Sequence, residues 1–147
     1  MKLSTKGRYG TRAMVDLAFH YGQGNVLLKD IAKRQGISDK YLEHLLTSLK
    51  IAGLVKSIRG AHGGYILAKP PGRIKLSQVI KVLEGSTAPV ECVDDPKMCS
   101  RTELCVTRDI WREIKKAIDK ILESVNLKDL VERERKKEQS KNVIYDI

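Results

Sequence analysis

Apolar and polar residues alternate most regularly between Gly36 and Gly53. Apolar side chains recur there at steps of three and four residues, the spacing that places them on one face of an α-helix. Ser38 is a favourable N-cap because its hydroxyl can accept a hydrogen bond from the first turn, and Gly53 is a typical residue after a helix end. The pattern predicts a helix that buries one face, formed by Tyr41, Leu42, Leu45, Leu46, Leu49 and Ala52.

A shorter helix is predicted just before it, over residues 29–35, with Ile31 and Ala32 facing inward and Gly36 as the turn. Two helices joined at a glycine are typical of a helix-turn-helix motif. The polar face of the second helix would then be available to the major groove of DNA. That face carries Lys40, Glu43, His44, Thr47 and Lys50.

A β-hairpin is predicted immediately afterwards, with strands at 55–58 and 65–67. The connection between the strands is rich in glycine and carries Arg59 and His62 at its tip. A basic hairpin beside a recognition helix is the arrangement of a winged helix-turn-helix, in which the hairpin contacts the flanking DNA backbone.

The remaining sequence contains more helical patterns and one irregular stretch. Helices are predicted over residues 8–21, 76–84, 106–125 and 127–139, and residues 25–28 form either a short strand or a turn. Residues 86–104 lack periodicity and are predicted to be a loop, and the charged run 132–141 is predicted to be frayed or disordered. The fold class is therefore mainly α with a small β-hairpin wing. Four parts are expected: a winged helix-turn-helix DNA-binding domain (1–85), a cysteine loop (86–105), a dimerisation helix (106–130) and a charged, flexible tail (131–147).

The helix predicted from Val106 to Val125 is long for so small a protein, since twenty residues span about 30 Å. Part of its apolar stripe packs on a second copy of the chain, or the whole stripe packs on its own domain. Because helix-turn-helix proteins usually bind two half-sites, we favour a homodimer on a palindromic operator in double-stranded DNA. The stripe consists of Val106, Ile110, Ile114, Ala117, Ile118, Ile121, Leu122 and Val125, with Trp111 beside it.

Positive charge is concentrated in the first part of the chain. The formal net charge is +10; residues 1–87 hold 15 Lys and Arg against 5 Asp and Glu, whereas residues 88–147 hold 13 of each. A basic surface confined to one part fits a polyanionic partner, because neutralising phosphates releases counterions. Solubility alone would not explain this segregation.

Several classes of protein are disfavoured by what the sequence lacks. No Ser/His/Asp set, phosphate-binding loop or catalytic carboxylate pair is evident, and the three histidines lie on separate predicted elements, so we expect no enzyme. A single Phe and scattered tyrosines offer little stacking surface for single-stranded RNA. No apolar run is long enough to cross a bilayer and no signal-peptide pattern is evident, so we expect a cytoplasmic protein without a membrane partner.

The predicted recognition helix and wing supply the candidate DNA contacts. The Glu43 carboxylate can accept a hydrogen bond from cytosine N4, or it pairs within the helix with Lys40 or Thr47. Arg59 suits a narrow, electronegative minor groove. The candidate DNA-binding residues are Ser38, Lys40, Tyr41, Glu43, His44, Arg59 and His62.

Three cysteines, Cys92, Cys99 and Cys105, gather within fourteen residues of the predicted loop. A disulfide is rare in the cytosol and would leave one thiol unpaired. Zinc sites usually contain closely spaced cysteine pairs, which are absent here. Three thiolates with one further ligand suit an iron–sulfur cluster, while a group of redox-sensing thiols remains the alternative.

Four stretches of the chain, MKLSTKGRYG, YLEHLL, GLVKSIRGAHGGY and VIKVLEG, resemble the Rrf-two family of bacterial winged-helix regulators. The resemblance runs through residues 1–125 and implies a homodimeric transcription regulator with a long dimerisation helix. It also implies that Glu43 and its neighbours read bases and that Arg59 enters the minor groove. Cluster-binding members carry three cysteines in this position, usually at equal spacings of five residues, so the six residues between Cys92 and Cys99 are a small departure.

The resemblance leaves the fourth ligand open. Some cluster-binding members use a histidine three residues after the last cysteine, where this chain has Arg108, and others use a carboxylate near the partner's N-terminus, where this chain has Arg8. An arginine stays protonated and cannot bind a metal. Nearby alternatives are Asp94, Asp95, Glu103, Asp109, an external thiol and water, so neither the fourth ligand nor the cluster type (2Fe–2S or 4Fe–4S) is assigned.

The sequence outside the cysteines is also similar to the family's cysteine-metabolism repressor. That protein has no cluster and responds to sulfur status through a cysteine-synthase partner. The resemblance therefore implies an alternative function: a regulator of sulfur metabolism that acts through such a partner or through its own thiols.

Overall fold

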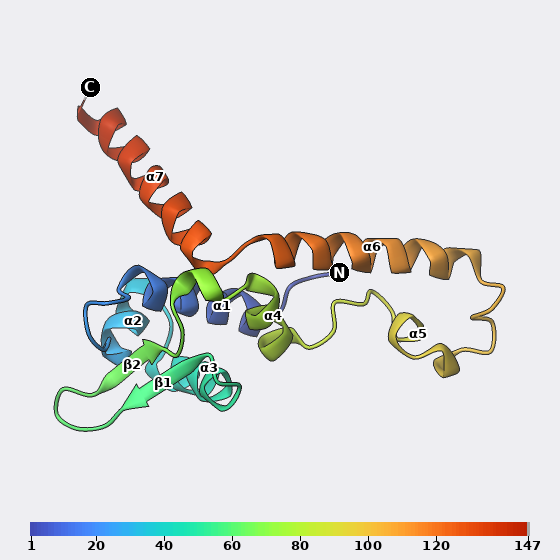
Figure 1. Ribbon diagram of the computed structural model, residues 1–147, viewed down its shortest axis with the longest axis horizontal. Helices are drawn as coiled ribbons and strands as arrows, with labels where there is room; N and C mark the ends of the chain where they lie inside the picture. The colour runs from blue at the N-terminus through green and yellow to red at the C-terminus, as the bar shows by residue number, and fades with distance from the viewer. Residues whose placement is uncertain (147) are drawn as a thin grey trace.

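The computed structural model describes residues 1–146; residue 147, the last of the predicted tail, lies outside the described residues. Figure 1 shows the order of the elements. The first part of the chain forms α1 (Thr5–Phe19), α2 (Leu28–Gln35), α3 (Asp39–Ile51), β1 (Val55–Ile58), β2 (Gly64–Leu67) and α4 (Leu76–Glu84). There follow α5 (Glu91–Asp94), α6 (Val106–Ser124) and α7 (Leu127–Asp146), with short 3-10 turns at Pro71–Arg73 and Pro96–Met98. We call α1 to α4 with the hairpin the body, and residues 86–125 the arm.

The helices α2 and α3 form the predicted helix-turn-helix. The first ends at Gly36, whose φ of 63° lies in the left-handed region that favours glycine. Ser38 then caps α3, because its Oγ accepts a hydrogen bond from the backbone N–H of Tyr41 at 3.2 Å. The turn and the cap together determine where α3 begins and which of its faces turns outward.

The hairpin pairs β1 with β2 in antiparallel register, from Val55 opposite Leu67 to Ile58 opposite Gly64. Val26 adds an isolated bridge to Tyr65, with a hydrogen bond of 2.8 Å in each direction. A side chain at Gly64 would place its Cβ 2.3 Å from the Val26 carbonyl oxygen, so glycine is required for this close approach. The bridge attaches the wing to the segment between α1 and α2.

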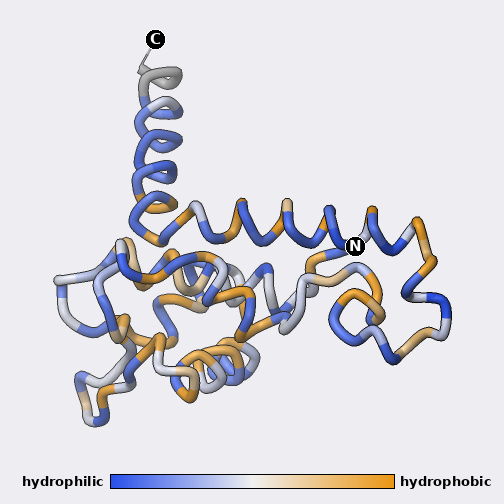
Figure 2. Tube along the Cα trace, turned by 45° about the vertical axis from the view of Figure 1, so that its right-hand side comes forward, coloured by the Kyte–Doolittle hydropathy of each residue, from blue (hydrophilic) through white to orange (hydrophobic). Residues whose placement is uncertain are grey.

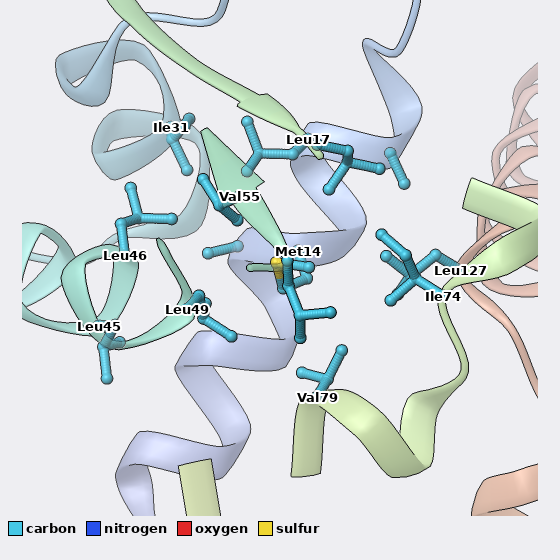
Figure 3. Close-up of a cluster of buried hydrophobic side chains, with 14 of the residues drawn as sticks. Met14, Leu17, Ile31, Leu45, Leu46, Leu49, Val55, Ile74, Val79 and Leu127 are labelled. Atoms are coloured by element: carbon cyan, nitrogen blue, oxygen red, sulfur yellow. The ribbon is translucent and has the colours of Figure 1, made fainter. Parts of the chain in front are cut away.

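Buried apolar side chains from α1, α3, α4 and the hairpin meet in one core (Figure 3). Met14 of α1 and Leu46 and Leu49 of α3 are fully buried. Burying one such side chain stabilises the fold by about 1.5–3 kcal/mol. Ala52, predicted on the buried face, is instead exposed, because it is the C-cap residue beyond the last turn of α3.

The arm is organised differently. Within the described chain, α6 has no buried residue, and Figure 1 shows it extending away from the body. Apolar positions recur along one side of it in Figure 2, and Val106, Ile110 and Ile121 are 76%, 50% and 64% exposed. Its C-terminal end is attached to the body by an ion pair of 3.1 Å between Lys75 and Glu123. The long helix predicted from Val106 to Val125 is thus confirmed, apart from its last residue.

Residues 86–104 contain more regular structure than we predicted. Instead of an irregular loop throughout, they include α5 and a 3-10 turn in which the Asp95 side chain accepts a hydrogen bond from the Lys97 N–H at 3.0 Å. Both elements are a single turn long. Such turns are too short for hydrophobic periodicity to reveal them.

The helix predicted over residues 127–139 is confirmed, but α7 continues to Asp146, so the charged run 132–141 is helical and not frayed as we predicted. The start of α7 is capped by reciprocal hydrogen bonds between Asn126 and Asp129, of 2.9 and 3.0 Å. Leu127 and Val131 are buried against the body, and the Arg135 guanidinium lies 5.1 Å from the centre of the Phe19 ring. The prediction of a flexible tail considered only charge, whereas this helix is anchored by its first turns.

The predicted fold class, mainly α with a small β-hairpin wing in a winged helix-turn-helix, is confirmed. None of the helices formed by the described residues is both long and apolar enough to cross a membrane.

Candidate nucleic-acid interface and cysteine segment

The polar face of α3 is exposed along its length. Lys40, Glu43 and His44 all lie on the exposed side, opposite the buried leucines. Thr47 donates a hydrogen bond of 2.8 Å to the backbone carbonyl of Glu43 rather than to its carboxylate. The Glu43 side chain is thus presented outward, where it can accept a hydrogen bond from a base edge.

Two further predicted contacts on α3 have structural roles of their own. The hydroxyl of Ser38 accepts the capping hydrogen bond. Tyr41 is half-buried and meets Tyr9 of α1 edge to face, with ring centres 6.4 Å apart and planes at 89°. Such aromatic pairs contribute about 0.5–1.5 kcal/mol beyond burial. Tyr41 therefore holds α3 against α1, and any contact with DNA would be additional to this role.

Cations of α1 gather beside this aromatic pair. The guanidinium groups of Arg8 and Arg12 lie 5.7 and 5.4 Å from the centre of the Tyr9 ring. Arg12 also donates to the side-chain and backbone oxygens of Gln35, at 3.1 and 2.8 Å. Basic residues at the start of α1 are thus brought beside the N-terminal end of α3, as a phosphate-contacting surface requires.

The wing presents Arg59 and His62 at its exposed tip. The side-chain amide of Asn25 donates a hydrogen bond to the carbonyl of His62, which ties the tip to the body. Sequence reasoning missed Asn25, because nothing in a segment interpreted as a strand or turn marks it as a partner of a residue 37 positions away.

Helix α3 lies close to the wing. Burial, and in addition the negative charge of Glu43, raise the pKa of Tyr65 on β2. The charge of Glu43 on α3 thus acts electrostatically on Tyr65 of the wing strand. The predicted helix and wing residues belong to neighbouring elements of one surface.

Asp16 joins the first helix to the helix-turn-helix. It is 5% exposed and accepts hydrogen bonds from Arg34 at 2.8 and 2.9 Å and from Gln35 at 2.9 Å. The hydrogen bonds to Asp16 raise the pKa of Arg34. A buried carboxylate requires such partners, and an acidic residue on the apolar face shared by Ala13 and Leu17 was the signal that could have identified it.

The three cysteines lie at three positions of the arm as free thiols. Cys92 is in α5, Cys99 follows the 3-10 turn, and Cys105 is the N-cap of α6. The Arg108 guanidinium donates a hydrogen bond of 3.0 Å to the Cys92 carbonyl, so α5 is fixed to the first turn of α6. Arg108, at the position where a histidine ligand was considered, thus has a structural contact of its own.

Cys105 has the most distinctive environment. Its Sγ lies 3.2 Å from the Thr107 Oγ1, and hydrogen bonds from the Thr107 side chain and then from the Arg108 backbone lower the pKa of its thiol. The N-terminus of a helix stabilises a thiolate in the same sense.

The donor chemistry of the arm fits an iron–sulfur cluster, but the arrangement is not that of a closed site. Three thiols are the ligand type that such clusters use. Within residues 1–146, however, no three His, Cys, Asp or Glu side chains are grouped so that they could hold a metal ion. The residues that would hold the cluster are therefore Cys92, Cys99 and Cys105, and the 86–105 segment would have to bring them together.

Comparison with known proteins agrees with this fold. Residues 3–133 match the family model described as "Rrf2: Iron-dependent Transcriptional regulator". The chain is 47% identical over 131 residues to the protein rrf2 of Nitratidesulfovibrio vulgaris. The aligned region covers 89% of this chain and 87% of that protein.

Two solved structures are similar along most of the chain. The structure of CymR, the global cysteine regulator of B. subtilis, matches with a TM-score of 0.76 and 43% identity, over 90% of this chain and 98% of that one. The structure of T. potens IscR matches with a TM-score of 0.75 and 47% identity, over 90% of this chain and 88% of that one. The resemblance to the Rrf-two family is thus confirmed: the chain belongs to the Rrf2 family and is a transcriptional regulator, not an enzyme.

Proposed function

We propose that the protein is a homodimeric, sequence-specific DNA-binding repressor whose affinity for its operator is set by the cysteines of the arm. The observation that carries the DNA-binding part is the joint exposure of Lys40, Glu43 and His44 on α3 and of Arg59 on the wing. These elements lie in the part of the chain that holds the whole excess of positive charge. Helix α3 would enter the major groove, and Arg59 the adjacent minor groove.

Homodimerisation would use the apolar face of α6. Ile110 and Ile121 lie eleven residues apart on a helix without buried residues in the described chain, so covering their exposed side chains would stabilise a dimer. Two copies joined along α6 would present two α3 helices, and a palindromic operator matches that two-fold symmetry.

The sensing part rests on Cys92, Cys99 and Cys105, which supply three soft thiolate donors on one segment. An iron–sulfur cluster, when bound, supplies redox-active iron whose potential depends on its ligands and exposure. Cys105 would hold it at the N-terminus of α6, and the bond from Arg108 to the Cys92 carbonyl would keep α5 in reach. The state of the three cysteines would then alter how α6 is held and hence the spacing of the two α3 helices.

Anaerobic purification followed by visible absorption spectroscopy tests the cluster. We expect a brown protein whose visible bands vanish in Cys99→Ala and persist in Ser100→Ala, the neighbouring exposed residue. An operator selected from a random duplex library should then bind the loaded and metal-free proteins with different affinities. Colourless wild-type protein after reconstitution with iron and sulfide would contradict the cluster, and equal affinities would contradict sensing.

Thiol sensing without a cluster is the second candidate. It is favoured by the separate positions of the three thiols and by the helix N-terminus at Cys105. The similarity to CymR, named a global cysteine regulator, also favours this candidate and suggests a cysteine-synthase protein as a partner to test. In this case diamide, or an added cysteine synthase, should change the operator affinity of metal-free wild-type protein, and Cys105→Ser should remove the diamide effect.

A further inference from the structure

The chain between α4 and the cysteine segment holds two other elements at once. Glu84 is the last residue of α4, and Thr87 lies three residues later, at the start of the arm. Each side chain makes its hydrogen bonds to a different helix. We call residues 84–87 the link.

On one side, the link is bonded to the N-terminus of α1. The Glu84 carboxylate accepts hydrogen bonds from the backbone N–H of Ser4 at 3.0 Å and of Gly7 at 3.1 Å, and also from the Ser4 hydroxyl. A Cβ at Gly7 would lie 2.2 Å from the Glu84 Oε1, so glycine permits the contact. The first turn of α1, Thr5-Lys6-Gly7-Arg8, contains no acid, and Glu84 supplies the negative charge that a helix N-terminus favours.

On the other side, the link is bonded to α6. The Thr87 hydroxyl lies 2.5 Å from the Asp119 Oδ1, and the Lys115 Nζ lies 2.6 Å from the Asp119 Oδ2. Thr87 is therefore fixed to the C-terminal half of the long helix, by a carboxylate that is itself bound by a lysine one turn away. A displacement of α6 relative to the body has to break this bond or carry the link with it.

The contacts continue from the N-terminus of α1 to the recognition helix. Gly7 is followed by Arg8 and Tyr9, and Tyr9 packs edge to face on Tyr41 of α3. Gly10 meets Leu83 of α4 so closely that a Cβ there would lie 2.4 Å from the Leu83 Cδ1. The end of α4 and the start of α1 thus fit closely together and leave little room for one to move alone.

We propose that Glu84 and Thr87 carry the state of the cysteine segment to the DNA-binding body, with Glu84 as the positioning residue for α1 and its Tyr9–Tyr41 contact with α3. This inference rests on the proposed function, since it assumes that the cysteines alter DNA affinity. It adds the residues through which they act. Loss of the Glu84 cap would free the start of α1, with Lys6 and Arg8, from the position set by the arm.

The test compares DNA affinity in two cysteine states, in the full-length chain. Fluorescence anisotropy with the library-selected operator measures the ratio of affinities between metal-free, reduced protein and protein either reconstituted with iron and sulfide or treated with diamide. Coupling between two sites is commonly about 5–150-fold. We expect a wild-type ratio in that range to fall below about threefold in Glu84→Ala and in Thr87→Val.

Two further variants separate coupling from folding. Ser86 lies within the link, and its hydroxyl accepts a local hydrogen bond from the Ala88 N–H at 3.1 Å, so Ser86→Ala should keep the wild-type ratio. Glu84→Gln keeps the shape and one acceptor oxygen but loses the charge, so it should fold and give an intermediate ratio. Hydrogen exchange of the Ser4–Gly7 amides should differ between the two cysteine states in wild type but not in Thr87→Val.

The possible results distinguish this inference from the function on which it rests. A wild-type ratio of one would overturn both. A wild-type ratio above fivefold that survives in folded Thr87→Val and Glu84→Gln would overturn the link and leave sensing intact. A drop of affinity by the same factor in both states would show that Glu84 only stabilises α1, and it would also overturn the proposal.

Discussion

In the body, most apolar side chains of α1 and α3 are buried within their own chain, whereas in the arm no described side chain of α6 is fully buried. Met14, Leu46 and Leu49 are fully buried, and Ile110 and Ile121 are half or more exposed. Both regions have regular apolar spacing, so the periodicity of the sequence does not distinguish them. The two regions differ in what covers their apolar side chains. The core of the body is completed within one chain, and the exposed part of the α6 stripe requires another surface.

Charge divides the molecule at nearly the same place. The excess of Lys and Arg lies in residues 1–87, and residues 88–147 are neutral overall. A basic, internally packed region suits rigid presentation of α3 and the wing to DNA, while a neutral, incompletely packed region suits assembly and response. The two regions should therefore react differently to the same kind of mutation.

The largest effect is expected in the core of the body. Leu46→Ala removes a fully buried side chain and should lower the free energy of unfolding by about 2–5 kcal/mol, because a cavity remains. Urea denaturation measures it. Ile51→Ala on the same helix, 83% exposed, is the matched control and should change stability by less than about 0.5 kcal/mol. Equal losses in both variants would mean that the body is not packed as described.

A smaller effect, and a different kind of effect, is expected on α6. Ile110→Asn combined with Ile121→Asn should leave the body folded but raise the dimer dissociation constant at least tenfold, or about 1.4 kcal/mol. Burial of one such side chain in an interface is worth about 1.5–3 kcal/mol. Analytical ultracentrifugation measures the constant, and Arg112→Asn with Lys120→Asn, exposed on the same helix, is the control. A dimer unchanged in the isoleucine variant would remove α6 from the interface.

The body was more predictable from sequence than the arm, for physical reasons. Ser38, Gly36 and the leucines of α3 specify their structure locally, through a cap, a turn and a periodic face. The single turns at α5 and Pro96–Met98 depend on one or two hydrogen bonds and leave no periodic pattern. The start of the C-terminal helix was predicted, but its continuation through the charged run 132–141 was not, because its anchors are long-range: Leu127 and Val131 are covered by residues distant in sequence.

The candidate site follows the same rule. Exposure of Lys40, Glu43 and His44 followed directly from the helical period. The partners that position the site did not: Asn25 with the wing tip, Asp16 with Arg34, and Glu84 with Ser4 are contacts between segments far apart in the chain. Sequence patterns thus predict which residues face outward on an element, but not which distant residue holds that element in place.

The third effect is expected on DNA binding, at the proposed DNA-facing surface of the body. Glu43→Ala should relax the preference at one base pair, at a cost of about 1–3 kcal/mol for the preferred sequence, because a hydrogen bond to a base edge is lost. Binding to operator variants substituted at single positions measures it. Lys50→Ala, exposed near the end of the same helix, is the control and should weaken all sequences alike. Uniform weakening by Glu43→Ala would instead assign it a structural role.

The smallest effects are expected from two carboxylates, and they should have opposite signs. Burial, then the charges of Glu138 and Asp16, raise the pKa of Glu134 on α7 above 4.5, whereas hydrogen bonds from Lys115 and Thr87 lower that of Asp119 on α6 below 3.8. Stability linked to Glu134 is present below about pH 4.5 and is lost as the pH rises through its folded pKa. Stability linked to Asp119 is present above about pH 3.8 and is lost as the pH falls through its folded pKa.

Glu134→Gln should therefore stabilise the protein at about pH 7 and change little at about pH 4, because the amide avoids the cost of a half-buried charge. Asp119→Asn should destabilise it at about pH 7, with a loss that shrinks in acid. Both side chains are partly exposed, so each effect should stay below about 0.5 kcal/mol. Urea denaturation at the two pH values measures the difference. Effects of the same sign would show that the charge on α7 is paired like that on α6, and that the C-terminal helix is held to the body by more than its apolar first turns.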